Sequence, residues 1–275
     1  MDSFNFNQYQ NIVIKVGSSL IAPDGRSCST QYCLPLASFI KKCQHLDKTV
    51  TLVSSGAVAA GVNTLKIDHS DLTLAKKQAC AAVGQAKLIN HWQRFFDNHV
   101  AQLLLTADDI KHPKRHQNAR KTIEQLHQYA ILPIVNENDT VATAELKFGD
   151  NDNLAAQVAT LINADLLIIC SDVDGVYNDN PHQNPQAELI PYIEQITDKT
   201  LALGKPTHNA QATGGMVTKL GAAQFASKAG INTIICNGKS EAYTSLLEHK
   251  ITGTFISSNK PYNQQNKPGI NIINA

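Results

Sequence analysis

Short apolar runs alternate with amphipathic segments along most of the chain. The apolar runs at 131–135 and 166–170 are continuous rather than alternating, as in parallel strands that are buried on both faces. Further strands are predicted at 12–16, 50–53, 100–105, 231–236 and 252–256. Segments with apolar residues at helical spacing separate them, at 36–43, 72–96, 119–130, 154–162 and 216–223. This order predicts an α/β fold with a mainly parallel sheet covered by helices on both faces.

The most polar stretch follows the strand at 131–135. From Asn136 to Asn153, nine side chains are Asn, Asp or Glu, and a helix is predicted from Leu154 with Asp152 or Asn153 as its N-cap. In open α/β sheets ligands bind beyond the carboxyl ends of the strands. Carboxylates and amides at that place could bind the ammonium and hydroxyl groups of a small polar ligand. The alternative is a solvated loop rich in turn-forming residues.

Two lysines stand out in two other strand–turn or turn–helix segments. Lys15 lies within the first strand, where it is costly to bury unless it faces an anionic partner; otherwise it reaches solvent at a frayed strand end. Lys219 follows Gly214 and Gly215 at a helix start, where free N–H groups can bind phosphate. The alternative there is a flexible lead-in to a helix.

Several classes of protein are disfavoured. Gly56 and Gly61 have the spacing of a Walker A loop, but Val62 replaces its lysine, and no G-x-G-x-x-G occurs. The six cysteines include no C-x-x-C pair, and 24 basic against 23 acidic residues indicate no nucleic-acid partner. No apolar run approaches the ~20 residues of a membrane span, and no signal peptide is visible, so we expect a cytoplasmic protein without a membrane partner.

Two local expectations concern helices and loops. The apolar stripe of 72–96, which includes Leu88 and Trp92, is typical of a core helix, with a subunit interface as the alternative. The segment 111–116 is expected to be a solvated loop, because Pro113 lies between its two histidines.

Six segments, in order, resemble the amino acid kinase family: I-K-V-G-S-S, V-S-S-G-A-V-A-A-G, I-V-N-E-N-D-T-V-A-T-A-E, F-G-D-N-D-N-L, S-D-V-D-G-V-Y and T-G-G-M-V-T-K. The resemblance covers about residues 10–256. It implies one three-layer α/β/α sandwich, the amino acid kinase fold, over residues 1–260, with an amino-acid site in the N-terminal half and an ATP site in the C-terminal half. A tail at 261–275 and no PUA domain are expected, because the chain ends at Ala275.

Within the family, the N-E-N-D and G-D-N-D-N segments resemble the branch that transfers a phosphoryl group from ATP, with Mg²⁺, to the γ-carboxylate of L-glutamate in proline biosynthesis. A carboxylate is already ionised at pH 7, so this reaction needs positive charge and positioning more than a general base. The resemblance implies that Lys15 and Lys219 stabilise charge on the transferred group and that Asp152 holds both lysines. It implies no dedicated metal ligands.

The resemblance also implies the binding residues. Those for L-glutamate are Ser55, Asp139, Asn151 and, as a helper, Asn136. Those for ATP are Lys15, Ser171, Asp172, Thr213, Gly214, Gly215, Met216, Val217, Thr218 and Lys219. A homo-oligomer, dimer or tetramer, and feedback inhibition by L-proline are expected.

Some positions depart from the family pattern, and other functions stay open. Ala210 and Ala212 replace glycines that are frequent in the family, which predicts a stiffer lid there, and Asn180 replaces the usual aspartate on the nucleotide side. One alternative is another member of the family, acting on acetylglutamate, aspartate, carbamate or a nucleoside monophosphate. The other is a non-catalytic ligand sensor on the same fold.

Overall fold

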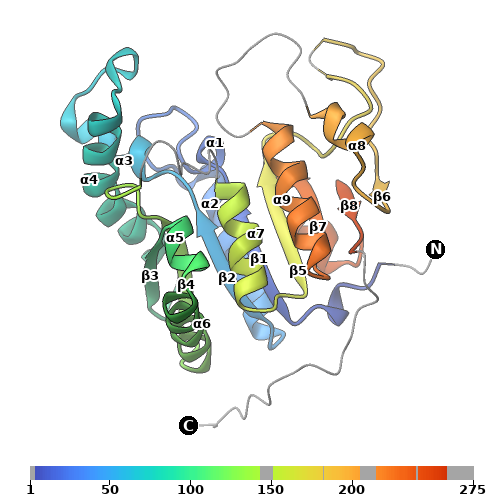
Figure 1. Ribbon diagram of the computed structural model, residues 1–275, viewed down its shortest axis with the longest axis horizontal. Helices are drawn as coiled ribbons and strands as arrows, with labels where there is room; N and C mark the ends of the chain where they lie inside the picture. The colour runs from blue at the N-terminus through green and yellow to red at the C-terminus, as the bar shows by residue number, and fades with distance from the viewer. Residues whose placement is uncertain (1–3, 143–150, 182, 205–214, 240, 259–275) are drawn as a thin grey trace.

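The protein is built around one eight-stranded sheet with helices on both faces (Figure 1). The computed structural model describes residues 4–142, 151–181, 183–204, 215–239 and 241–258. In sheet order the strands are β3 (Val100–Leu105), β4 (Leu132–Glu137), β2 (Thr49–Ser54), β1 (Asn11–Val16), β5 (Leu166–Ser171), β7 (Asn232–Asn237), β8 (Thr254–Ile256) and β6 (Tyr192–Ile193). The helices are α1 (Ser18–Ile21), α2 (Thr30–His45), α3 (Ala57–Leu65), α4 (Leu74–Gln93), α5 (Ala107–Lys111), α6 (Pro113–Gln128), α7 (Asn151–Leu161), α8 (Asp198–Leu203), α9 (Met216–Lys228) and α10 (Ala242–Leu247), with 3₁₀ turns at Phe6–Gln8 and His69–Asp71.

The sheet is mainly parallel, as predicted. β1 lies between β2 and β5, with Lys15 opposite Val53 on one side and Ile169 on the other. The pairs β2–β4, β3–β4, β5–β7 and β6–β8 are also parallel, and only β7–β8 is antiparallel among the described pairs. The carboxyl ends of the central parallel strands therefore meet at one edge, which is where a ligand site is expected.

Two hydrophobic clusters, one on each side of the sheet, confirm the three-layer arrangement. Ile12 and Ile14 of β1 belong to the cluster that contains Trp92 of α4. Val13 belongs to the other cluster, which contains Leu154 of α7 and residues of α9. This division follows from the strand geometry, because successive side chains point to opposite faces. Lys15 alternates with Ile14 as Val13 does, so it points toward the face covered by α7 and α9.

Helices α3 and α4 pack at unusually close range. A Cβ built on Gly84 would lie 1.8 Å from the carbonyl oxygen of Ala57, and one on Gly61 would lie 1.9 Å from that of Cys80. Glycine at both positions lets the two backbones touch. Trp92 is completely buried, so the expectation of a core helix is confirmed.

Three local predictions were wrong. The segment 111–116 is not a loop, because Pro113 begins α6. The missing N–H of proline costs nothing at the first position of a helix. β4 continues past Val135 to Glu137, since the sheet edge accommodates polar side chains. α7 already includes Asn151, so Asp152 and Asn153 lie in its first turn and neither is the N-cap. Within the described residues no helix is both long and apolar enough to cross a membrane.

Candidate active site at the carboxyl edge of the sheet

Two lysines from distant parts of the chain contact the same carboxylate. Lys15 Nζ lies 2.6 Å from Asp152 Oδ1, and Lys219 Nζ lies 3.3 Å from Asp152 Oδ2. All three side chains are buried, with exposed fractions of 2%, 0% and 8% for Lys15, Asp152 and Lys219. The structure therefore brings together the three predicted catalytic residues, which we call the lysine–aspartate triad.

The fold explains why the triad forms. Lys15 lies near the end of the central strand β1, while Asp152 and Lys219 lie in the first turns of α7 and α9. A carboxylate in the first turn of a helix is stabilised by the free N–H groups and the helix dipole. Since α7 and α9 pack side by side over β1 and β5 (Figure 1), their first turns meet above the strand ends.

The turn before α9 adds further polar groups. Gly215 is the N-cap of α9 in an extended conformation, without a side-chain cap. The Thr218 hydroxyl lies 2.8 Å from Asp152 Oδ2, to which it can donate, and 2.8 Å from the carbonyl oxygen of Gly215. Of the predicted ATP-binding turn, Gly215 to Lys219 are described, whereas Thr213 and Gly214 lie outside the described residues.

A second polar cluster joins three of the predicted glutamate-binding residues. Asn151 Nδ2 donates to Ser55 Oγ over 2.9 Å and to Asn136 Oδ1 over 2.7 Å. Asn136 Oδ1 also accepts from the backbone N–H of Glu137 at 2.9 Å. Asn151 directly precedes Asp152, so this cluster adjoins the triad. Three amide or hydroxyl groups on separate elements can thus face one small polar ligand.

The other predicted residues lie at the same edge. Asp139 lies two residues beyond β4 and is partly exposed. Ser171 ends β5 and is buried, with its hydroxyl 3.4 Å from Asp172 Oδ1. Asp172 is exposed. Ala210 and Ala212 lie outside the described residues, and so does the expected tail at 261–275.

A pocket of about 310 Å³, the acidic pocket, lies beside the end of β4. Asp108, Asp109, Arg115 and Glu137 contribute to its lining. Burial raises the pKa of Asp109, but hydrogen bonds from the Thr106 side chain and backbone, together with Arg115, leave this pKa below its ordinary value. Asp109 is therefore ionised at neutral pH. These residues form no recognisable binding motif in the sequence, although the Thr106–Asp109 spacing is that of a capping box.

The sequence comparisons identify the family. The model of the amino acid kinase family matches residues 10–237, which is most of the chain. The chain belongs to the amino acid kinase family. It is 47% identical over 249 residues to the glutamate 5-kinase of Idiomarina loihiensis, and 52% identical over 228 residues to that of Salinibacter ruber. These alignments cover 90% and 82% of this chain but 67% and 61% of the relatives. This family member therefore spans about two thirds of their length.

Two solved structures share the fold. A carbamate kinase from Giardia lamblia, bound to AMP-PNP, superposes with a TM-score of 0.63 at 19% identity, covering 92% of this chain and 100% of that one. A UMP kinase from Bacillus anthracis gives a TM-score of 0.60 at 15% identity, covering 92% and 97%. At such low identity these matches show the fold alone.

Proposed function

We propose that the protein transfers the γ-phosphoryl group of ATP to the γ-carboxylate of L-glutamate, forming L-glutamyl 5-phosphate and ADP in the cytoplasm, as the first step of proline biosynthesis. The observation that carries this proposal is the convergence of Lys15 and Lys219 on Asp152, beside the Asn151 cluster. The names of the relatives at 47% and 52% identity support glutamate as the substrate.

Electrostatics and positioning account for the reaction. The γ-carboxylate carries the attacking lone pair, so no proton has to be removed before attack. Both nucleophile and phosphate are anionic, and two ammonium groups lower their mutual repulsion. A lysine about 4 Å from a phosphate oxygen gains ~4 kcal/mol at an effective dielectric constant of 20. Asp152 keeps Lys15 and Lys219 pointing at one place, so the charge is in position before the phosphoryl group moves.

The two substrates are proposed to bind at neighbouring places along the carboxyl edge of the sheet. Ser55, Asn151 and Asn136 hold the substrate carboxylates by hydrogen bonds, and Asp139 accepts from the substrate ammonium. ATP lies at the carboxyl end of β5 and the start of α9, where Ser171, Asp172 and the turn before Lys219 contact it. The free N–H groups at the start of α9 suit a phosphate group.

Mg²⁺ is proposed to arrive with the ATP phosphates. Among the described residues no group of three or more His, Cys, Asp and Glu side chains could hold a metal ion. Mg²⁺ at kinase sites is usually held by substrate phosphates, water and one or two carboxylates, and the exposed Asp172 at the end of β5 could supply one. The ion would neutralise charge on the β- and γ-phosphates. Feedback inhibition by L-proline and assembly into a dimer or tetramer are further proposals, drawn from the family resemblance.

The deciding experiment measures glutamate-dependent ADP release, with hydroxylamine trapping the acyl phosphate as a hydroxamate. Aspartate, N-acetylglutamate, carbamate and UMP serve as parallel acceptors. Hydroxamate formation with L-glutamate alone is expected. ADP release that favours another acceptor, or nucleotide binding without transfer to any of them, would contradict the proposal.

A further inference from the structure

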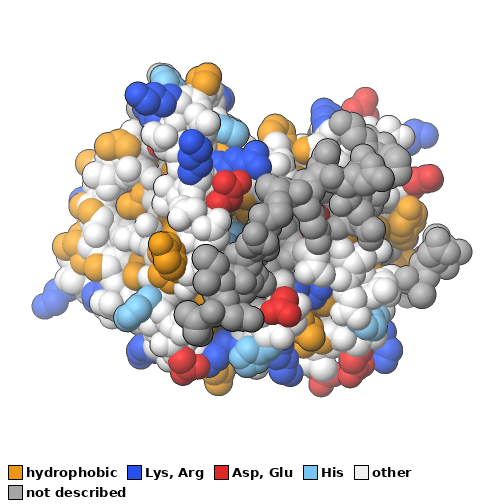
Figure 2. Space-filling model, turned by 90° about the horizontal axis from the view of Figure 1, so that it is seen from below, with side chains coloured by type: hydrophobic (Ala, Val, Ile, Leu, Met, Phe, Trp, Pro, Cys, Tyr) orange, Lys and Arg blue, Asp and Glu red, His pale blue; other side chains and the backbone are white. Residues whose placement is uncertain are grey.

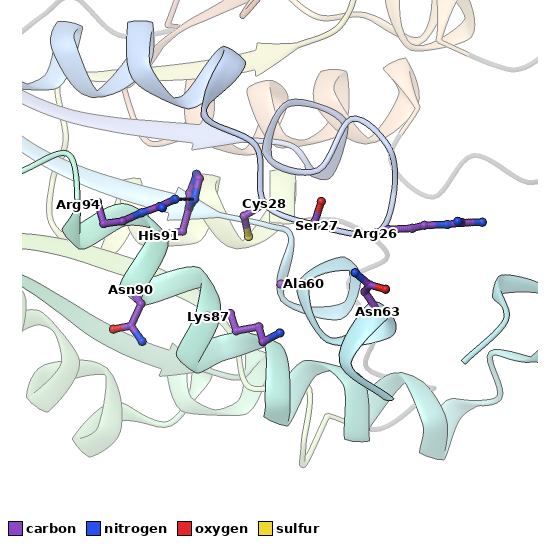
Figure 3. A pocket seen from close by; sticks show the side chains of 9 residues that line it. All are labelled: Arg26, Ser27, Cys28, Ala60, Asn63, Lys87, Asn90, His91 and Arg94. Carbon is purple, nitrogen blue, oxygen red and sulfur yellow. Dashed lines mark hydrogen bonds between the residues drawn. The ribbon is translucent and has the colours of Figure 1, made fainter. Parts of the chain in front are cut away.

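A second pocket, the basic pocket, lies between the loop that joins α1 to α2, helix α3 and helix α4 (Figure 3). It is open to solvent and has a volume of about 330 Å³. None of the residues assigned above to glutamate or ATP lines it. Its cationic side chains are Arg26 from the loop and Lys87 and Arg94 from α4. Lys87 and Arg94 lie two turns apart on α4, but Arg26 comes from a distant loop, so the sequence alone does not show that the three line one pocket.

The basic pocket is lined by cations and not by carboxylates. Among the described residues no Asp or Glu side chain lines it, and the neighbouring Asp24 carboxylate accepts hydrogen bonds from the backbone N–H groups of Arg26 and Ser27. Arg26, Lys87 and Arg94 form no ion pair with any carboxylate in the part of the chain that the structure describes. The acidic pocket has the opposite character, with several carboxylates around one arginine. Because the whole chain is almost neutral, a concentration of three cations around one hollow is a local feature.

Two of the three cations are held in place by neighbouring side chains. Arg94 lies 2.6 Å from Nδ1 of His91, measured from a terminal guanidinium nitrogen, and the two side chains lie together at one end of the pocket in Figure 3. Burial of His91, and then the charge of Arg94, lower the pKa of this histidine. His91 is therefore neutral and can accept the hydrogen bond from Arg94. Lys87 Nζ donates to Thr64 Oγ1 on α3. Side chains ordered in this way lose less entropy when a ligand binds.

The electrostatic influence of these cations reaches Cys28, which also lines the pocket. Burial raises the pKa of the Cys28 thiol, Arg94 and Lys87 act in the opposite direction, and Asp24 adds a smaller raising effect. An anion in the pocket would therefore experience the field of the same two side chains. Neutral donors are also present: the amides of Asn63 and Asn90 contribute to the lining.

We propose that the basic pocket binds a small molecule that carries a phosphate group. A phosphate presents three oxygens and close to two negative charges, which suit an ammonium, a planar guanidinium group and neutral amide donors. Lys87 and Arg94 supply the first two, while the Arg26 guanidinium points away from them and adds positive charge at the rim (Figure 3). A volume of about 330 Å³ is at the small end of ligand pockets, so the phosphate is inorganic or carries only a short carbon skeleton. Inorganic phosphate and a small phosphate monoester present the same kind of anionic oxygens to the pocket. This proposal is independent of the proposed kinase activity.

Trp92 offers a built-in reporter for this pocket. It is the only tryptophan in the chain, and its ring centroid lies 6.3 Å from that of the pocket residue His91. Its indole N–H donates to Ser54 Oγ over 3.0 Å, next to the predicted glutamate-binding residue Ser55. A ligand that shifts His91 or Arg94 should therefore change the fluorescence of Trp92.

The test is calorimetric and fluorescence titration of the full chain with inorganic phosphate and with glycerol 3-phosphate. Phosphate can also bind near the triad, so the titration is repeated on Lys219→Ala and, in that background, on the double variant Lys87→Gln/Arg94→Gln. One saturable site should persist in Lys219→Ala. The double variant should bind roughly 100-fold more weakly, at about tenfold for each lost charge-assisted contact.

The controls separate a lost site from a lost fold. Lys41→Gln and Lys76→Gln remove exposed lysines outside the pocket and should bind as the parent does. Lys87→Arg keeps the charge and should retain most of the affinity. The double variant should keep the parent's circular dichroism spectrum and thermal midpoint.

Three outcomes would overturn the proposal: phosphate binding of parental strength in a folded double variant, loss of all phosphate binding in Lys219→Ala, or binding of succinate as tight as that of either phosphate compound. Tighter binding of glycerol 3-phosphate than of inorganic phosphate would support a phosphate monoester as the ligand. Equal affinity would support inorganic phosphate.

Discussion

The ammonium group of Lys15 lies 2.6 Å from Oδ1 of Asp152, although β1 and α7 are separated by most of the N-terminal half of the chain. Both side chains are almost fully buried. Burial of a charged pair is costly unless the geometry is good and other polar groups complete it. Lys219 and Thr218 complete it on the second carboxylate oxygen. A buried charged cluster that costs folding free energy is typical of a functional site.

The first prediction concerns the two lysines. Lys15→Ala or Lys219→Ala should lower kcat for glutamate-dependent ADP formation by roughly 10²–10³, because each removes a charge that stabilises the transferring phosphoryl group. Lys41→Ala, which removes a partly exposed lysine paired with Asp97, is the matched control and should leave kcat unchanged. A nearly normal kcat in either triad variant, with the fold intact, would show that the roles are wrong.

The second prediction separates binding from chemistry. Asp139→Ala should raise the KM for glutamate by roughly 10- to 100-fold, since a charge-assisted hydrogen bond to the substrate ammonium is lost. The KM for ATP should change little. Asp139→Asn, which keeps the shape but not the charge, should fall between parent and Asp139→Ala. An unchanged glutamate KM in both variants would remove Asp139 from the substrate site.

The third prediction concerns the stability of the triad. Asp152→Asn should lower the free energy of unfolding by about 3 kcal/mol, because the partner carboxylate of two buried lysines is lost. Urea denaturation at pH 7 measures this change. Asp97→Asn breaks the exposed pair with Lys41 and should have little effect. Equal stability of Asp152→Asn and the parent would mean that water or relaxation compensates the buried ammonium groups.

Much of this arrangement could be predicted from the chain alone. The continuous apolar runs predicted the parallel strands, and the polar stretch after β4 predicted where Asn136, Asn151 and Asp152 would gather. The family resemblance, rather than the spacing, connected Lys15 with Lys219. Such a contact depends on how α7 packs over β1 with α9 beside it, which no local pattern encodes.

Other features could not be predicted because tertiary context decides them. Pro113 disfavours a helix interior but suits its first position, and only the end of α5 at Lys111 makes that position available. The basic pocket joins a loop, α3 and α4, and its cations resemble ordinary surface residues until the fold brings them together. The apolar stripe of 72–96 suited either a core helix or a subunit interface. The complete burial of Trp92 shows that this stripe belongs to the core.

The fourth prediction concerns pH. Burial lowers the pKa of His127 to about 4, against the smaller opposing effects of the Val50 carbonyl and Glu124. In the unfolded chain, His127 binds a proton near its ordinary pKa of about 6.5. In the folded protein, His127 stays neutral down to about pH 4. Stability from this group is fully present above pH 6.5 and is lost as the pH falls toward 4. Between pH 7 and pH 5 the loss should be on the order of 1–2 kcal/mol.

Urea denaturation of the parent and of His127→Gln at both pH values measures this contribution. The parent should lose more stability than His127→Gln on going to pH 5, and the difference isolates His127 from other titrating groups such as His91, whose pKa is also lowered. An identical pH dependence in the two proteins would show that His127 protonates without cost in the folded state.

The last prediction compares two helix glycines. Gly84→Ala should destabilise the protein by roughly 1–3 kcal/mol or more, because the added methyl meets the Ala57 carbonyl at 1.8 Å and forces α3 away from α4. Gly221→Ala, in the interior of α9, has nothing within 4 Å of the new Cβ and should stabilise by roughly 0.5–1 kcal/mol. Because α3 begins beside Ser55, Gly84→Ala should also raise the KM for glutamate, whereas Gly221→Ala should not. Denaturation curves and kinetics of both variants test this contrast, and stabilisation by Gly84→Ala would contradict the close packing of the two helices.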